Sequence, residues 1–341
     1  MSEAVLFSTR TMLRMVEQAK RPRRFLLDLF FGGPPENSMS EYVDIDIYNG
    51  KRRMAPFVNP KHEGKLVERT GYTTRTYKPP YVKPKMITTA ADIFTRMPGE
   101  HAYIGGKTAG QIAAEHLGRD MADLDDQITR REEWMAAQAL NGGVVNIVGD
   151  GVDDTIDFQM PANHKVTLSG TDLWSDAGSD PIADLRAWKR RVVQTCGIAA
   201  DAAVFGQDVV NAFLKNDEVK AQLDNRRIDL GTALMQDLDE TGAIFIGRFG
   251  GVDCFAYDEW YLDENGDEQP MVPVDKVLVG STRVRTARHY GMIQDVGNMA
   301  SVDRFPKTWV EQDPSARFIM LQSAPLVVPH QIGGFLTATV L

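Results

Sequence analysis

The longest regular pattern of apolar positions in the chain lies between residues 108 and 140. Its apolar side chains recur at spacings of three, four and seven residues: Leu117, Met121, Leu124, Ile128 and Met135. This spacing places them on one face of a helix. The pattern predicts a helix over residues 108–140, ended by Asn141–Gly142 and roughly 45–50 Å long. A helix of that length forms either a coiled coil or the support of an elongated subunit.

A second pattern, strand-like but poor in large apolar side chains, covers residues 43–87. Segments 54–58 and 65–69 lead toward Thr70–Gly71, and segment 72–77 follows, so we expect a long hairpin that turns at residues 70–71. An isolated hairpin is marginally stable in water. This ribbon therefore needs another surface to lie on, which is the first indication of assembly.

The first forty residues are typical of an arm rather than of a domain. A basic stretch at residues 20–24 precedes an apolar segment that contains Phe25, Phe30 and Phe31, and Gly32–Gly33–Pro34–Pro35 ends it. Two interpretations stay open. The segment is either a short helix packed on its own domain or an apolar segment that docks on a neighbouring subunit.

Helix and strand patterns alternate over the rest of the chain, which predicts an elongated subunit of mixed helix and strand. We expect a small sheet from segments 144–148, 155–160 and 165–168, with a turn at Asp150–Gly151. Asp180 and Pro181 begin a helix that Gly197 ends. Strands are expected at 202–205 and 243–249, and helices at 209–213, 219–223 and 230–238. A hairpin of 253–262 and 271–279 turns at Asn265–Gly266, and two last strands, 318–321 and 335–341, return to the sheet beside the long helix.

Composition and charge exclude several classes of protein. The 341 residues carry a formal net charge of −9, which argues against a protein built to grip phosphate backbones. The two cysteines, Cys196 and Cys254, form no C-x-x-C pair and indicate a reducing compartment. No apolar run approaches the roughly 20 residues that span a bilayer. We therefore expect a protein that is made and used in water.

Candidate chemistry is weak throughout. Gly105–Gly106–Lys107–Thr108 resembles a phosphate-binding loop, but the motif requires glycine where this chain has His101. The acidic residues Asp150, Asp153 and Asp154 lack calcium-loop spacing, and the six histidines show no metal-ligand spacing. We expect no catalytic residue, no cofactor and no metal site.

The chain from the ribbon onward, and most clearly its C-terminal third, resembles the major capsid proteins of lambda-like tailed bacteriophages. The stretches that carry the resemblance follow one another in the family's order. They are 81–85 (YVKPK), 174–175 (WS) with 180–181 (DP) after it, 223–227 (LDNRR), 277–280 (VLVG), 290–295 (YGMIQD), 305–310 (FPKTWV), 313–318 (DPSARF) and 322–326 (QSAPL). Each is weak alone, but together and in order they are specific. The departures lie in the first forty residues, in 99–108 and after Pro329.

The resemblance implies an α+β fold of the Hong Kong 97 capsid type with five parts. Residues 1–42 would form the N-terminal arm and 43–95 the extended loop. Residues 96–182 would form the peripheral domain with its spine helix at about 108–140. The axial domain would cover 183–288, and 289–341 would return to the peripheral domain.

The implied function is that of a shell subunit. Pentamers and hexamers would close into an icosahedral shell around double-stranded DNA, bound without sequence specificity. The implied partners are a separate scaffolding protein, a portal protein and a decoration protein at the three-fold positions, with no membrane. The implied location is the virion capsid, assembled in the cytoplasm of the bacterial host.

The candidate assembly contacts are apolar, aromatic and basic residues of the arm, the ribbon and the axial region. They are Phe25, Phe30, Phe31, Phe57, Leu66, Arg69, Tyr72, Tyr77, Arg226 and Arg227.

Three alternatives to the role of a phage shell subunit remain. A protein nanocompartment of the same fold would differ in its neighbouring genes. A nucleotide-binding enzyme would lose binding on Lys107→Ala, and a monomeric binding protein would protect the ribbon from hydrogen exchange.

Overall fold

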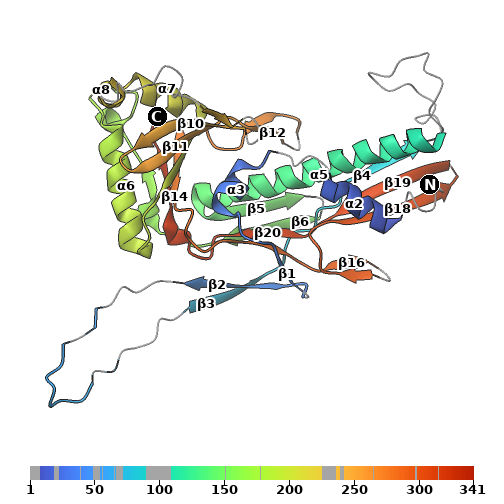
Figure 1. The fold of residues 1–341 in the computed structure, drawn as a ribbon, viewed down its shortest axis with the longest axis horizontal. Coiled ribbons are helices and arrows are strands. Elements are labelled where there is room, and N and C mark those ends of the chain that lie inside the picture. The colour runs from blue at the N-terminus through green and yellow to red at the C-terminus, as the bar shows by residue number, and fades with distance from the viewer. Residues whose placement is uncertain are drawn as a thin grey trace.

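The computed structural model shows an elongated subunit with a long loop that projects from one side (Figure 1). It describes residues 8–18, 23–38, 40–48, 54–55, 57–64, 66, 72–89, 109–149, 151–176, 178–224, 236–238, 242–263, 265–295, 298–313 and 315–341. A long helix runs along one half of the subunit, and a unit of sheet and helices forms the other end.

The long helix α5 (Ala109–Gly142) confirms the prediction within two residues at either end. Its stripe residues Leu117, Met121, Leu124 and Ile128 are buried because they pack on an antiparallel sheet of order β18–β19–β4. That sheet, called the spine sheet below, consists of β4 (Lys85–Thr89), β18 (Phe305–Gln312) and β19 (Ser315–Gln322). The arm helix α2 (Thr9–Gln18) places Met12 in the same apolar cluster.

Arg304 fastens the segment before β18 to α5. Its Nε donates to Asp125 at 2.7 Å and its Nη1 to Glu132 at 2.6 Å, and Nη2 donates to the Thr129 hydroxyl at 3.1 Å. Because the guanidinium is buried, these acceptors replace the water that it loses on folding.

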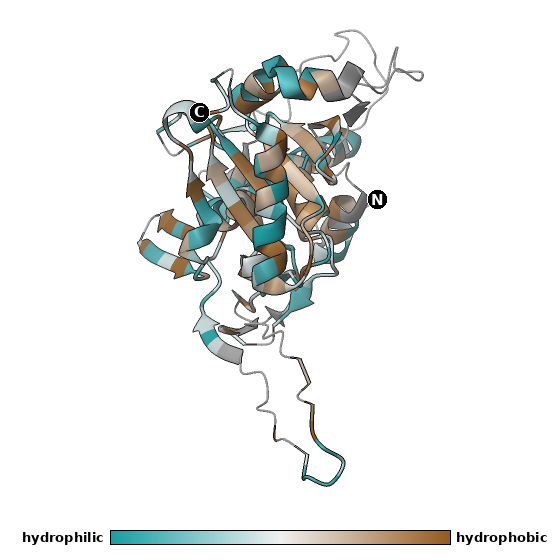
Figure 2. Cartoon of the chain, turned by 90° about the vertical axis from the view of Figure 1, so that its left-hand side faces the viewer, coloured by the Kyte–Doolittle hydropathy of each residue, from teal (hydrophilic) through white to brown (hydrophobic). Residues whose placement is uncertain are grey.

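Among the described residues, seven strands form the large sheet, of order β7–β21–β14–β8–β11–β10–β9. Their bounds are β7 (Lys165–Thr167), β21 (Phe335–Thr339), β14 (Lys276–Gly280), β8 (Ala202–Phe205), β11 (Val252–Tyr257), β10 (Ala243–Phe249) and β9 (Gln236–Leu238). The helices α6 (Pro181–Cys196), α7 (Gln207–Lys215) and α8 (Asp217–Asp224) accompany it. Figure 2, which faces α6, shows hydrophobic strands behind the partly polar surface of that helix.

The ends of α6 follow the sequence prediction. Asp180 accepts hydrogen bonds from the backbone amides of Ile182 and Ala183 at 3.1 and 2.9 Å. Gly197 ends the helix with φ 84°, a left-handed conformation that glycine adopts without steric cost.

Shorter elements join the two ends of the subunit. Arm helix α3 (Phe25–Phe30) and strand β1 (Glu36–Asn37) precede the loop, and β1 pairs with β15 (Ala287–Tyr290), which pairs with β20 (Pro325–Val328). Three antiparallel pairs complete this region: β5 (Val144–Gly149) with β6 (Val152–Asp157), β12 (Trp260–Leu262) with β13 (Glu268–Pro270), and β16 (Ile293–Asp295) with β17 (Asn298–Ala300).

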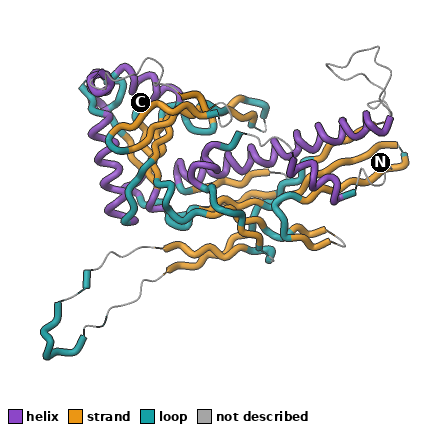
Figure 3. Tube along the Cα trace, in the orientation of Figure 1, coloured by secondary structure: helices purple, strands orange, loops and turns teal. Residues whose placement is uncertain are grey.

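The structure contains the predicted ribbon, but the predicted pairing of its strands is wrong. Strand β3 (Tyr72–Tyr77) pairs with β2 (Val43–Tyr48), with Tyr72 opposite Tyr48, and not with residues 65–69 (Figure 3). A turn lies at Asn59–His62, where the amide of His62 donates to the Asn59 carbonyl at 2.9 Å. Val43 and Ile45 of β2 are buried in the hydrophobic core of the subunit. This burial selects β2 as the partner of β3, and the sequence pattern of the ribbon alone could not reveal it.

Three other predictions differ from the structure for one shared reason, which is pairing between distant segments. Residues 236–238, expected to be helical, form edge strand β9 beside β10. The Asn265–Gly266 turn joins β12 to β13, whereas β14 pairs with β21 and β8. Strand β7 belongs to the large sheet and not to the β5–β6 pair, and β21 also joins the large sheet, where it still contacts α5 near the end of the helix as expected. Strands 202–205 and 243–249 are confirmed as predicted.

Candidate assembly surfaces

The arm residues Phe25, Phe30 and Phe31 lie in the core of their own subunit. The Phe25 ring packs 5.3 Å from Phe255 and 5.4 Å from Tyr257, and the edge of Phe30 meets Phe335 at 5.4 Å. In this conformation α3 belongs to the subunit's own fold, the first of the two interpretations of the arm. The prediction that Phe25, Phe30 and Phe31 contact a neighbouring subunit stays a prediction.

The side chain that fixes α3 is the buried Glu133 of α5. Its carboxylate accepts hydrogen bonds from the amides of Leu26 and Leu27 at 2.7 and 3.0 Å, and from the Tyr257 hydroxyl at 2.9 Å. Burial raises the pKa of Glu133 to about 7, although the three donors act in the opposite direction. One carboxylate thus joins the arm, the long helix and the large sheet.

The loop tip, defined as the described residues between 54 and 66, carries uncovered apolar side chains. Phe57 is 107% exposed, Leu66 97% and Met54 94%. Tyr77, at the base of the ribbon, instead packs on Phe158 and donates to the Asp157 carbonyl at 3.0 Å. Uncovered apolar side chains on a projecting loop are typical of contact surfaces.

The structure says less about the remaining predicted contact residues. Tyr72 lies at the outer end of the ribbon, opposite Tyr48. Arg69, Arg226 and Arg227 lie outside the described residues, as does the phosphate-loop-like segment 105–108.

A second exposed apolar surface, which sequence reasoning missed, lies on the spine sheet. Trp309, Phe318 and Ile87 are cross-strand neighbours, and the Trp309 and Phe318 rings stack at 5.1 Å. Ile87 is 55% exposed. We call these three residues the aromatic ladder. The sequence pattern predicted only 318–321 of this sheet as a strand, so the cross-strand neighbours of Phe318 could not be identified.

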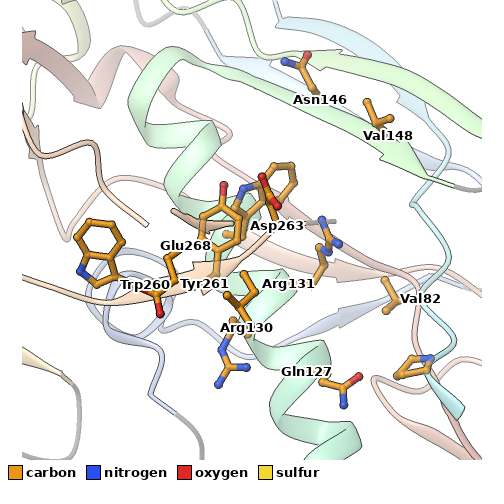
Figure 4. Close-up of a pocket in the computed structure, with 13 residues that line it drawn as sticks. Val82, Gln127, Arg130, Arg131, Asn146, Val148, Trp260, Tyr261, Asp263 and Glu268 are labelled. Carbon is orange, nitrogen blue, oxygen red and sulfur yellow. The ribbon is translucent and has the colours of Figure 1, made fainter. Parts of the chain in front are cut away.

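A third surface is an open groove of about 670 Å³ between α5, β5 and the β12–β13 hairpin. Figure 4 shows its side chains, which converge from segments far apart in the sequence. Exposed apolar groups come from Trp260 and Leu262, with Val148 beyond them. Arg131 lies 5.2 Å from the Trp134 ring, which it contacts as a cation on an aromatic face.

A buried histidine pair lies where the arm meets the loop. The Nε2 atoms of His289 and His330 are 3.3 Å apart, and Glu36 of β1 lies 3.6 Å from Nδ1 of His289. Burial lowers the pKa of His289, and Arg285 and His330 lower it further, whereas Glu36 raises it. The neutral form of His289 is therefore favoured near pH 7.

No group of three or more His, Cys, Asp or Glu among the described residues can hold a metal ion. Over the same ranges, no helix is long and apolar enough to cross a bilayer. The surfaces described above are suited to contact between proteins.

Comparison with known proteins gives a consistent result. The sequence model of the family described as phage major capsid protein E matches residues 8–340. The major capsid protein of Enterobacteria phage P21 is 30% identical over 339 residues, covering 95% of this chain and 96% of that protein. The major capsid protein of Escherichia phage lambda is 29% identical over 336 residues, with the same coverage of 95% and 96%.

The fold has a solved counterpart. The capsid protein of a prophage of E. coli CFT073 superposes with a TM-score of 0.71 at 20% identity, covering 98% of this chain and 99% of the other. At that identity the likeness concerns the fold, and it agrees with the sequence relationship.

Proposed function

The chain belongs to the phage major capsid protein E family and has the role of a capsid shell subunit, and from this premise we propose how its parts build the shell. The fold is the Hong Kong 97-type α+β fold expected from the sequence, and the role of the family is structural. The proposal concerns the domains, the contacts and the partners.

We assign the large sheet with α6–α8 to the axial domain, at the centre of pentamers and hexamers. The spine helix α5 and the spine sheet form the peripheral domain, residues 96–182 and 289–341 in outline. Strands β7 and β21 fall within these two residue ranges but pair in the large sheet. The peripheral segments therefore contribute two strands to the axial domain. Residues 1–42 form the arm and 43–95 the extended loop.

The observation that carries the proposal is the loop with its uncovered tip. Phe57 and Leu66 are almost fully exposed. The loop that contains them projects from the subunit body beyond the paired strands β2 and β3 (Figure 1). A monomer gains nothing from exposing these side chains, whereas a shell subunit uses them to cover an adjacent copy. Many such moderate contacts, each near roughly 1,600 Å² in total, add up to a stable shell.

The partners follow from this role. We propose a separate scaffolding protein inside the forming shell, a portal protein at one vertex and a decoration protein at the three-fold positions. Double-stranded DNA fills the shell without base-specific contacts, in keeping with the net charge of −9. Assembly takes place in the host cytoplasm, and the subunit performs no catalysis and holds no cofactor.

The test is to purify the chain expressed alone and together with its neighbouring genes. Mass is measured by light scattering, and particles are imaged by negative stain. Rings of five or six, closed shells or tubes are the expected result. A well-folded monomer under both conditions contradicts the proposal. Shells that enclose a protein cargo and never DNA would identify a nanocompartment instead.

A further inference from the structure

We infer that the outer face of helix α6 binds the phosphate backbone of the double-stranded DNA inside the shell. This inference rests on the proposed function, because it assigns to one helix the contact between the subunit and the packaged DNA. The contact is electrostatic and independent of base sequence, and it directs the outer face of α6 toward the interior of the shell.

The outer face of α6 is basic. Residues 186–191 read RAWKRR, so four of the six side chains in this segment are cations. The opposite side of the helix, which includes Trp188 and Val192, is buried in the core of the large sheet. Arg186 and Arg190 are exposed. A rise of 1.5 Å per residue separates them by about 6 Å along the helix, so both can contact one strand of a duplex.

The positive charges on this face are not neutralised within the described part of the subunit. Arg186 and Arg190 form no ion pair with any described residue. Lys189 and Arg191 donate hydrogen bonds to backbone carbonyl groups at 2.7 and 2.8 Å. A carbonyl is a neutral acceptor, so these bonds position the two cations and leave their charge available to an anion.

The carboxylates close to this face have other partners. Asp184, the acidic residue of α6, accepts a hydrogen bond from Nε1 of Trp174 at 2.9 Å. Asp253, which begins beside the β10–β11 turn, pairs with Arg248 at 3.5 Å. The chain has 47 acidic and 38 basic residues, so carboxylates are plentiful. A cluster of cations without acidic partners in such a chain points to an anion from outside the subunit.

The face lacks the apolar anchor that a contact between proteins requires. Its exposed positions beside the two arginines include the small residues Ala183 and Ala187. Among the described residues, no exposed large apolar side chain lies on α6. Protein interfaces concentrate their binding energy in apolar and aromatic groups, whereas a phosphate backbone is bound by cations alone. Guanidinium groups also bind phosphate oxygens in a bidentate manner, which favours DNA over a second copy of the chain.

The contact agrees with the net charge of −9. Each subunit offers only a few cations to the DNA, so a single contact is weak and depends strongly on salt. Weak contacts without base readout let DNA move past the inner surface while the shell fills. Repetition over all copies in the shell then holds the outermost DNA in place.

Binding of the unassembled full chain to a short DNA duplex of arbitrary sequence tests the contact. Fluorescence anisotropy gives the association constant across a series of salt concentrations. The test variant is Arg186→Gln with Arg190→Gln. The matched control is Lys215→Gln with Lys220→Gln, which removes the same charge from exposed side chains of α7 and α8. Urea unfolding checks that both variants fold, and light scattering measures their particle formation.

The control should bind the duplex about as the wild type does. The test variant should bind more weakly. The slope of log K against log salt should be smaller in magnitude by about 2, because each lost phosphate contact removes about 0.9.

Absence of binding by the wild type, unchanged binding by the test variant, or an equal loss in the control overturns the inference. Particle formation by the wild type leaves the proposed function intact in each case. Loss of particles in the test variant with unchanged duplex binding also overturns the inference, because α6 then faces a second copy. Absence of wild-type particles contradicts the proposed function itself, whatever the duplex binding shows.

Discussion

Single buried charged residues decide how the arm is held. Glu133 is the clearest case, because its carboxylate receives the first amides of α3 and the Tyr257 hydroxyl in a site closed to water. No sequence pattern indicates this role. Glu132 and Glu133 are adjacent and identical in type, yet Glu132 bonds Arg304 and Glu133 bonds the arm.

Glu133 makes the stability of the fold depend on pH. Its pKa rises from 4.5 to about 7 on folding, so the folded state favours the protonated carboxyl. The free energy of unfolding of the wild type therefore falls as pH rises from 4.5 through about 7, and Glu133 accounts for up to about 3 kcal/mol of this decrease. Glu133→Gln removes this titration. Urea unfolding across that range should show the difference between the two proteins changing with pH, and parallel pH profiles would contradict this account of the site.

The histidine pair predicts an opposite dependence. The pKa of His289 is lowered from 6.5, so its contribution is present above that pH and is lost as pH falls through 6.5 toward the folded value. Glu36, Arg285 and His330 are the charged and titratable groups that face it. Acidification should lower the hydrogen-exchange protection of the Ser38 amide, which donates to the Tyr290 carbonyl at 2.8 Å. In His289→Gln this acid-induced loss should be smaller, and an unchanged loss would rule out the histidine as its cause.

At the scale of elements, the sequence predicts those whose signals are local. The stripe of α5, the Asp180 cap with Pro181 and Gly197, and strands β8 and β10 were all predictable from neighbours along the chain. The partners of β2, β9 and β21 were not, because each is selected by apolar surface contributed from a distant segment. The groove was invisible for the same reason, since α5, β5 and β12 meet only in the folded chain.

The attachment of α5 to the spine sheet depends on Arg304. Arg304→Ala leaves Asp125 and the buried Glu132 without their cation, which should cost about 3–5 kcal/mol of unfolding free energy. Arg130→Ala is the matched control, because Arg130 forms an exposed pair with Asp126 on the same helix and should cost less than about 1 kcal/mol. Chemical denaturation of both variants measures the contrast. Equal losses would show that the buried network contributes no more than a surface pair.

At the scale of the whole molecule, the fold and the assembly are separable. The loop tip contributes nothing to the described core, whereas it supplies the most exposed apolar side chains. Phe57→Ala with Leu66→Ala should therefore leave the free energy of unfolding of the subunit, measured by urea denaturation, within about 0.5 kcal/mol of the wild type. The same variant should need a roughly tenfold higher subunit concentration to form particles. Light scattering across a dilution series measures this, and unimpaired assembly would remove the loop tip from the contact.

The most direct test of the shell architecture is a cryo-electron microscopy reconstruction of the assembled particle. We expect the large sheet with α6–α8 around the five-fold and six-fold axes, the spine helix and spine sheet toward the rim, and each loop lying on an adjacent copy. A particle whose loops fold back on their own subunits, or whose ring centres are formed by the spine sheet, would contradict the account.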